Sequence, residues 1–306
     1  MHELIDRTIE QVGTILLGKD EQIRLALTCL FSGGHLLIED LPGMGKTTLA
    51  HTLARVLGLS FNRIQFTSDL LPADILGVSI FDKQNQQFSF HPGPIFNQVI
   101  LADEINRATP KSQSALLEAM EEGQVTIEGE SRPLPSPFFV IATQNPDTQA
   151  GTFPLPESQL DRFLMKIELG YPDPAAERIL MKGESRRDVL ARLGASLNAE
   201  QLAEIQHQCR QVNVSDALLD YVQRLVQYTR DAKEFAYGLS PRGGLALLGC
   251  AKTWAYIDRR SHVVPEDVQA VLGPIVEHRL REAADFSGHG GGALAQRLLN
   301  QVDVIG

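Results

Sequence analysis

The feature that most restricts the fold is a glycine-rich turn between a short apolar run and a helix-forming segment. The run His35-Leu36-Leu37-Ile38 has the length and composition of a strand buried in a parallel sheet. The turn Leu41-Pro42-Gly43-Met44-Gly45-Lys46-Thr47 follows it, and a helix is expected from Lys46 to Leu57. This order of strand, turn and helix predicts a phosphate-binding loop at one edge of an open α/β sheet.

Short apolar strands alternate with helices beyond this turn as well. The helix expected over residues 110–122 has proline at its first position and Gly123 after its end. Further strands are expected over residues 61–66, 99–102, 138–142 and 164–169. The alternation predicts a parallel sheet covered by helices on both faces, which is the α/β class.

Two segments interrupt this alternation, and a third divides the chain. Residues 77–90 and 124–130 are predicted to form hairpins. The stretch Tyr171-Pro172-Asp173-Pro174 is the predicted domain boundary. Beyond it we find only helical spacing, so we expect an α/β core over residues 1–172 and a smaller all-α domain without strands over residues 173–306.

Composition limits the partners and the compartment. The 306 residues carry a net charge of −10, from 28 basic and 38 acidic side chains, which disfavours nucleic acid and anionic membranes as partners. Cys29, Cys209 and Cys250 are far apart and form no CxxC pair, so buried free thiols are expected. No apolar run approaches the ~20 residues that span a bilayer, and residues 1–6 lack the pattern of a signal peptide. We therefore expect a cytoplasmic protein without membrane insertion.

The turn contains the residue types that hold phosphates. Gly43 and Gly45 let backbone N–H groups crowd around phosphate oxygens, and the helix directs its positive end toward them. Lys46 is expected to neutralise the outer phosphates, and the Thr47 hydroxyl to ligate magnesium. Asp40 stands where the general phosphate-loop pattern has its first glycine, which leaves the geometry of the first turn open.

Polar residues follow two further apolar strands. Asp103 and Glu104 end the run Val99–Ala102, at the sheet edge where ligands bind. Asp103 is expected in the magnesium shell, and Glu104 is expected to polarise an attacking water. Asn145 is expected to hold that water, although Asn145-Pro146 is also a common turn pair.

Two arginines also stand out. Arg162 lies just before the last predicted strand, where an arginine is commonly a surface salt-bridge partner. Arg242, in Ser240-Pro241-Arg242, lies in the first turn of a helix, where a positive charge opposes the helix dipole. Such a local conflict is typical of functional residues.

Taken in order, these segments resemble the AAA+ ATPases and, within them, the MoxR family. The resemblance covers nearly the whole chain. It rests on GKDEQI at Gly18, LLIEDLPGMGKTTLA at Leu36, RIQFTSDLLPADILG at Arg63, FHPGPIF at Phe90, LADEINRATPKSQSALLEAMEEGQVTIEG at Leu101, ATQNP at Ala142, LPESQLDRFLMKI at Leu155 and SPRG at Ser240. It implies an AAA+ P-loop core followed by a helical lid domain, with residues 77–90 as the helix-2 insert and residues 124–130 as the pre-sensor hairpin.

The resemblance also implies roles for individual residues. The loop around Lys46 resembles Walker A and Asp103-Glu104 resembles Walker B, and these motifs imply ATP and Mg²⁺ as cofactors. Asn145 resembles sensor 1, Arg242 resembles sensor 2, and Arg162 resembles the arginine finger that enters a neighbouring subunit's site. The implied ATP contacts are Leu17, Gly18, Pro42, Gly43, Met44, Gly45, Lys46, Thr47, Thr48 and Asp103, and the implied Mg²⁺ ligands are Thr47 and Asp103. Arg107 is a second candidate for an interface arginine.

The family further implies a homo-oligomer, typically a hexameric ring, that acts as a chaperone on protein or metal-cofactor partners with a von Willebrand factor A domain protein. A nucleic-acid motor and a nucleotide-switched scaffold with negligible turnover are the alternatives. Residues 121–130 hold four glutamates and no lysine or arginine, and the hairpin 77–90 holds one lysine, which disfavours the motor. Glu104 disfavours the scaffold, because a pure switch has no need of a water-activating carboxylate. Three phenylalanines, Phe81, Phe88 and Phe90, are suited to packing or to gripping an apolar partner.

Overall fold

A five-stranded parallel sheet forms the centre of the core. The computed structural model describes residues 1–83, 86–145, 152–183, 186–282 and 293–305. The strand order is β2-β5-β8-β1-β9, and every neighbouring pair is parallel. The strands are β1 (Leu36–Glu39), β2 (Phe61–Gln65), β5 (Val99–Asp103), β8 (Phe139–Gln144) and β9 (Met165–Ile167). The predicted α/β class is confirmed, and each of the five apolar runs is a strand of this sheet.

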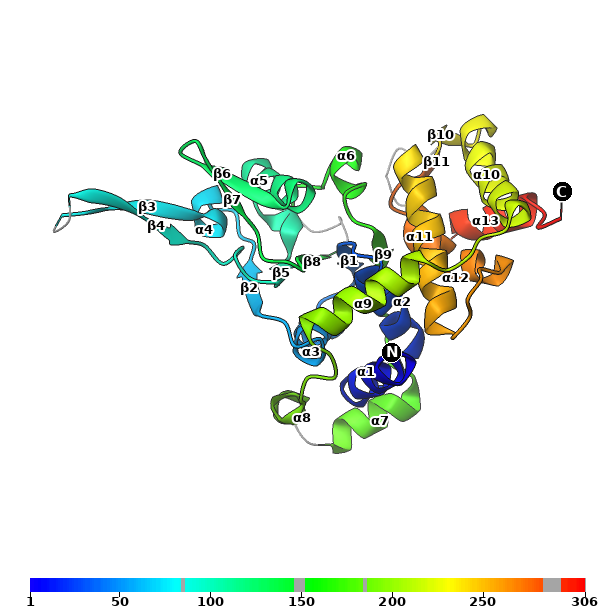
Figure 1. Cartoon of the computed structure of the whole chain (residues 1–306), viewed down its shortest axis with the longest axis horizontal. Helices are drawn as coiled ribbons and strands as arrows, with labels where there is room; N and C mark the ends of the chain where they lie inside the picture. The colour runs from blue at the N-terminus through cyan, green and yellow to red at the C-terminus, as the bar shows by residue number, and fades with distance from the viewer. Residues whose placement is uncertain (84–85, 146–151, 184–185, 283–292, 306) are drawn as a thin grey trace.

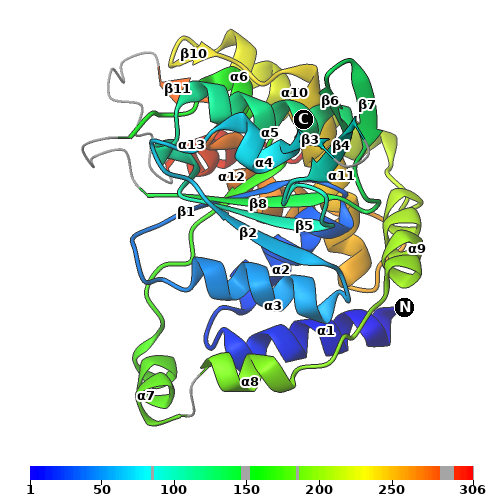
Figure 2. The same cartoon turned by 90° about the vertical axis from the view of Figure 1, so that its left-hand side faces the viewer.

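Helices cover both faces of the sheet (Figure 2). Alternate residues of one strand enter different apolar clusters, so Leu36 and Ile38 pack on one side while Leu37 packs on the other. The first side is covered by α1 (His2–Ile15), α2 (Asp20–Phe31) and α3 (Lys46–Val56), and the second by α4 (Pro72–Leu76) and α5 (Pro110–Glu122). This period of two is what a strand buried on both faces requires.

The first predicted hairpin projects far from the body of the core (Figure 1). Its strands are β3 (Gly77–Asp82) and β4 (Gln87–Pro92). Near the tip, Phe81 and Phe88 face each other with ring centroids 5.3 Å apart, and 49% and 69% of their surfaces are exposed. Phe90, nearer the base, packs against Phe96 at 5.8 Å. Packing therefore accounts for Phe90, whereas the tip carries exposed apolar surface.

The second hairpin is longer than the sequence predicts. It consists of β6 (Gln124–Ile127) and β7 (Glu130–Pro133), so it continues three residues beyond Glu130. The extension brings in Arg132, whose guanidinium lies 4.1 Å from the ring centroid of Phe90 in the first hairpin. The strand β7 has one intermediate and three exposed residues, which leaves no apolar pattern from which its length could be predicted.

The segment after Tyr171 begins with two helices, α7 (Pro174–Lys182) and α8 (Arg186–Arg192), of which α8 lies along α1 (Figure 2). The Arg55 guanidinium donates to the carbonyls of Ala191 and Leu193 at 2.7 Å each. The amide of Ser196 donates to the carbonyl of Val56 at 2.7 Å. Residues 191–196 are thereby attached to the end of α3.

The rest of the C-terminal part is helical apart from one pair of strands. Its helices are α9 (Ala199–Arg210), α10 (Asp216–Asp231), α11 (Pro241–Ile257), α12 (Pro265–Val276) and α13 (Ala293–Gln301). The predicted helical character of this part is confirmed, but β10 (Phe235–Tyr237) and β11 (Arg281–Glu282) form a short antiparallel pair that the sequence did not predict. Elements of three and two residues are too short to show a period of two in the sequence.

The remaining expectations about burial and length can be checked directly. Cys29, Cys209 and Cys250 are free and buried, as predicted. Burial raises the pKa of the Cys209 and Cys250 thiols to about 12. Within the described ranges, no helix combines the length and the apolar character that crossing a membrane would need.

Candidate functional site

The turn after β1 has the geometry of an anion cradle. Gly43 and Gly45 adopt φ angles of 87° and 92°, in the left-handed region that glycine enters without steric cost. A Cβ atom added to either glycine would meet no heavy atom within 4 Å, so the space in front of the loop is open. The helix α3 begins at Lys46, which aims its first N–H groups at this space.

Lys46 is held at the centre of the loop. The residue is 7% exposed, and its ammonium donates to Asn145 Oδ1 at 3.0 Å and to the carbonyl of Leu41 at 3.3 Å. A further bond joins it to the Asp40 carbonyl. Burial lowers the pKa of Lys46, and the nearby Asp40 carboxylate opposes that shift most strongly. An ammonium ion surrounded by neutral carbonyls is well placed to exchange them for phosphate oxygens.

Asp40 has a structural role that its place in the motif did not reveal. Its Oδ2 atom accepts from the amides of Leu169 and Gly170 at 2.8 and 2.7 Å, and its Oδ1 atom accepts from Leu41 N at 2.7 Å. The side chain therefore joins the start of the phosphate loop to the segment after β9. A glycine at this position would leave that connection unmade.

Asp103 ends β5 and is held from both neighbouring strands. Its Oδ1 atom accepts from the Thr143 hydroxyl of β8 at 2.6 Å. Its Oδ2 atom accepts from two atoms of Arg63 on β2, Nη2 at 2.6 Å and Nε at 3.0 Å. The residue is 6% exposed, so these partners fix the direction of a nearly buried carboxylate.

Glu104 has an unusual backbone and three side-chain partners. Its φ and ψ of 57° and 49° are left-handed, which is uncommon outside glycine and typical of residues held for function. The Oε1 atom accepts from Asn145 Nδ2 at 2.9 Å. The Oε2 atom accepts from Gln65 Nε2 at 3.1 Å and from Arg107 Nη1 at 2.9 Å. Asn145 thus bridges the Lys46 ammonium and the Glu104 carboxylate.

Hard oxygen donors are available for a magnesium ion. Thr47 lies half-buried in the first turn of α3, directly after Lys46. Asp103 presents its carboxylate from the end of β5, at the same sheet edge. A hydroxyl and a carboxylate, with water and phosphate oxygens completing the shell, are a donor set that fits Mg²⁺.

A cavity of about 580 Å³ adjoins the phosphate loop. It is the right size for a bound nucleoside, since small-molecule sites range from about 300 to 1,000 Å³. The cavity is lined by Ile15, Leu16, Leu17, Lys19, Pro42, Gly43, Met44, Gly45, Thr48, Tyr171, Pro172, Glu177, Leu180 and Met181. Leu17 is therefore on the wall with the loop residues. Gly18 lies behind the wall, where an added Cβ would stand 2.7 Å from Asp173 Oδ2.

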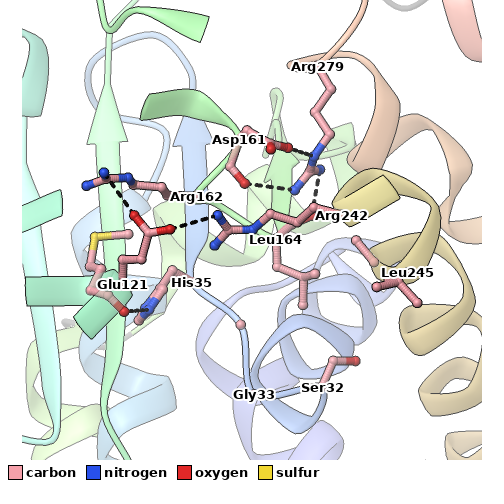
Figure 3. A pocket seen from close by; sticks show the side chains of 13 residues that line it. Ser32, Gly33, His35, Glu121, Asp161, Arg162, Leu164, Arg242, Leu245 and Arg279 are labelled. Carbon is pink, nitrogen blue, oxygen red and sulfur yellow. Dashed lines mark hydrogen bonds and ion pairs between the residues drawn. The ribbon is translucent and has the colours of Figure 1, made fainter. Parts of the chain in front are cut away.

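Arg162 and Arg242 lie in a different place. Both pair with Glu121 at the end of α5, Arg162 at 2.9 Å and Arg242 at 3.3 Å (Figure 3). They line a cavity of about 390 Å³ with the residues that precede β1 and β9, including His35 and Leu164. Lys46 follows the carboxyl end of β1, so the two arginines are at the opposite edge of the sheet. The four residues of β1 alone span roughly 13 Å.

Comparison with known proteins places this arrangement in a family. Residues 35–165 match the "ATPase family associated with various cellular activities (AAA)", and residues 227–298 match the "AAA lid domain". The "Chaperone MoxR1" of Mycobacterium tuberculosis is 41% identical over 90% of this chain and 75% of its own length. The "Protein MoxR" of Paracoccus denitrificans is 31% identical over 87% of this chain and 85% of its own. The chain belongs to the MoxR family of AAA+ ATPases.

Two further relatives of this MoxR-family chain extend over almost all of it. The "Uncharacterized protein YeaC" of Bacillus subtilis is 40% identical over 99% of this chain and 96% of its own length. A crystal structure of an ATPase candidate from Cytophaga hutchinsonii superposes with a TM-score of 0.89 at 37% identity, covering 99% of this chain and 95% of that one. The fold and the family resemblance are thereby confirmed across the core and the lid.

Several residues of this MoxR-family site were not predicted to act in it. Arg63 and Gln65 lie on β2 and reach Asp103 and Glu104, and Thr143 of β8 supports both acidic residues. Arg63 and Gln65 are alternate exposed residues near the carboxyl end of a strand in the sheet, and that pattern could have identified them. The contact of Asp40 with the segment after β9 had no comparable local signal.

Proposed function

We propose that this MoxR-family protein is a Mg²⁺-dependent ATPase whose active site is completed by a neighbouring subunit. The observation that supports it is the separation of two groups of residues. Lys46, Asp103 and Glu104 converge at the carboxyl edge of the sheet, whereas Arg162 and Arg242 meet at the amino edge. Arg162 lies just before β9, so one chain cannot bring Arg162 to the phosphate held by its own Lys46 without refolding its sheet.

The roles at the carboxyl edge follow from the contacts. Lys46 leaves the carbonyls of Asp40 and Leu41 for the outer phosphates. Thr47 and Asp103 would hold Mg²⁺, which supplies positive charge at the β- and γ-phosphate oxygens. Glu104 accepts the proton of an attacking water, because its carboxylate is anchored on both oxygens and lies beside Asn145. Asn145 bonds both Lys46 and Glu104, so its amide lies where it can hold that water.

The roles at the amino edge concern the next subunit. Arg162 is 26% exposed and Arg242 is 50% exposed, and both point into an open cavity that contains no phosphate-binding loop. Both guanidiniums share one carboxylate, Glu121, which either must leave to reach a neighbour's phosphate. A head-to-tail ring places such an edge against the next subunit's site, and the MoxR family is typically hexameric. Arg107 contacts Glu104 of its own chain at 2.9 Å, so Arg162 is the better candidate for the trans-acting arginine.

The partner is proposed to be a protein or metal-cofactor protein. The tip of the first hairpin exposes Phe81 and Phe88, which suits contact with apolar protein surface. Arg132 in the second hairpin is stacked on Phe90 and is not free for phosphate contacts along a nucleic acid. Together with the net charge of −10, this favours a chaperone-like role, with a von Willebrand factor A domain protein as co-partner, in the cytoplasm. The nucleic-acid motor remains the second hypothesis, without an observation that favours it.

Two single variants test the hydrolytic site. Lys46→Ala is expected to abolish ATP binding, because Lys46 meets the phosphates before and during the reaction. Glu104→Gln is expected to bind ATP normally and to hydrolyse it about 10²–10⁴-fold more slowly, the usual loss for a general base. Glu10→Gln, an exposed glutamate on α1, is the matched control and should retain the parent rate. If Glu104→Gln hydrolyses ATP at the parent rate, Glu104 is not the general base. If Lys46→Ala binds ATP with normal affinity, the loop around Lys46 is not the phosphate-binding site.

A further inference from the structure

Arg279 is a nearly buried arginine of the lid that faces the segment carrying Arg162. It follows α12 by three residues, and its side chain is 4% exposed. Burial lowers the pKa of Arg279, and the carboxylate of Asp161 opposes that shift, so the guanidinium remains charged. A buried charge is costly unless its hydrogen bonds are made, and the partners of Arg279 therefore show what this side chain holds in place.

Partners of Arg279 both precede and follow Arg162 in the sequence, and Figure 3 shows Asp161 and Leu164 among them. Before Arg162, Arg279 Nε donates to Asp161 Oδ1 at 2.6 Å. After it, Arg279 Nη2 donates to the carbonyl of Phe163 at 2.6 Å, and Nη1 donates to the carbonyl of Leu164 at 3.1 Å. Nη1 also donates to the carbonyl of Ile275 in the last turn of α12, at 2.7 Å. One guanidinium thus connects the end of a lid helix to the backbone around Arg162.

We propose that Arg279 is a positioning residue that determines where Arg162 is presented to the neighbouring subunit, and that it couples this position to the lid of its own subunit. This inference rests on the proposed role of Arg162 in the next subunit's site. Arg279 touches neither the phosphate loop nor the reacting atoms, and acts through the Asp161 carboxylate and the backbone carbonyls of Phe163 and Leu164.

The arrangement restrains Arg162 at two points. Glu121 holds its guanidinium from the core, and Arg279 holds its backbone from the lid. Leu164 is also fixed, because its amide donates to the carbonyl of His35 at 2.8 Å and its side chain fills the space beside Gly34. When the lid moves, the bonds of Arg279 to Asp161 and to the carbonyl of Phe163 pull on the segment that carries Arg162, while Leu164 stays attached to the core at His35. The nucleotide state of one subunit would thereby alter the arginine that it offers to the next.

Arg279→Gln tests this role. A misplacement of about 1 Å at a reacting centre lowers the rate by about 10²-fold, so kcat at saturating ATP should fall by about that factor while ATP affinity stays at the parent value. The variant keeps an intact Lys46 and Glu104, so mixing it with Glu104→Gln subunits, which still present a correctly held Arg162, should restore turnover. The double variant Arg162→Ala/Arg279→Gln should turn over no more slowly than Arg162→Ala alone.

Arg260→Gln is the matched control for loss of an arginine pair in the lid. Arg260 bonds the buried Asp267 at the start of α12, the opposite end of the same helix. Arg260→Gln should lower the thermal midpoint but leave kcat unchanged, because Arg260 touches no residue of the segment 161–164. Equal loss of kcat in both variants would show that general damage to the lid explains the effect, and would overturn the inference.

The other outcomes separate this inference from the proposed function. If Arg162→Ala loses turnover while folded Arg279→Gln keeps the parent kcat, the inference is wrong and the proposed function stands. If Arg162→Ala itself keeps the parent kcat, the shared site is wrong and the inference fails with it. If Arg279→Gln folds but mixing it with Glu104→Gln subunits restores no turnover, the inference is also wrong. Should Arg279→Gln not fold, Asp161→Asn removes the charge of the same pair from a side chain 28% exposed, and a parent kcat in that variant would overturn it.

Discussion

Replacing Asp40 by glycine restores the general phosphate-loop pattern and is nevertheless expected to damage the loop. Asp40→Gly removes the carboxylate that accepts from Leu169 N and Gly170 N at 2.8 and 2.7 Å. Hydrogen bonds to a charged group contribute about 1.5–3 kcal/mol each, so the two together account for about 3–6 kcal/mol. Leu169 is 1% exposed, which limits the water that could replace its partner, whereas the Leu41 amide lies in an exposed turn and should lose little.

The assay is thermal unfolding with and without ATP. At about 2 °C per kcal/mol, the lower end for long chains, the midpoint of Asp40→Gly should fall by roughly 6–12 °C. Asp40→Asn keeps an acceptor oxygen but loses the charge, so its midpoint should lie between those of the parent and the glycine variant. ATP should also raise the midpoint of Asp40→Gly less than that of the parent, because the start of the loop is no longer joined to the segment after β9. A glycine variant that unfolds at or above the parent temperature would refute this reasoning.

Three further predictions concern pH, packing and partners. His35 accepts from Val140 N through Nδ1 and is therefore neutral, and burial lowers its pKa to about 4. In the unfolded chain this histidine binds a proton below about pH 6.5, so up to about 3 kcal/mol of the stability present above that pH should be lost as the pH falls to 4. Denaturant unfolding at several pH values measures this loss, which should be smaller in His35→Gln. Gly18→Ala should lower both stability and ATP affinity, because Gly18 has a φ of 67° and an added Cβ would meet Asp173. Gly13→Ala, where the added Cβ meets open space within α1, should raise stability by up to about 1 kcal/mol. Equal effects of the two variants would contradict the prediction. DNA and RNA should not stimulate hydrolysis at physiological salt, and a several-fold stimulation that high salt abolishes would favour the motor.

The sequence was sufficient for the sheet and for the residues at its carboxyl edge. The apolar runs at Leu36, Val99 and Phe139 are buried strands, and buried strands leave little freedom in where the following polar residues lie. Asp103 is the last residue of such a strand, and Lys46 follows another after one turn. Local pattern therefore predicted their neighbourhood without knowledge of the rest of the chain.

Contacts between distant segments could not be predicted in this way. Asp40 meets Leu169 and Gly170 across about 130 residues of chain, and the partners of Arg279 around Arg162 lie 115 or more residues away from it. The pairing of β10 with β11 was not predicted either, because each strand is too short to show a pattern of its own. Tertiary packing determines these contacts, and no periodicity in the sequence records it.

The measurement that most directly tests the shared active site is the ATPase rate of mixed rings. Arg162→Ala leaves its own pocket intact and lacks the arginine for its neighbour, and Glu104→Gln has the opposite defect, so each alone should be nearly inactive. After subunit exchange, shown by energy transfer between labelled subunits, roughly a quarter of the interfaces in an equal mixture pair an intact Glu104 with an intact Arg162. The shared site predicts partial but clear recovery of hydrolysis. A mixture that exchanges subunits and stays as inactive as its components would contradict it.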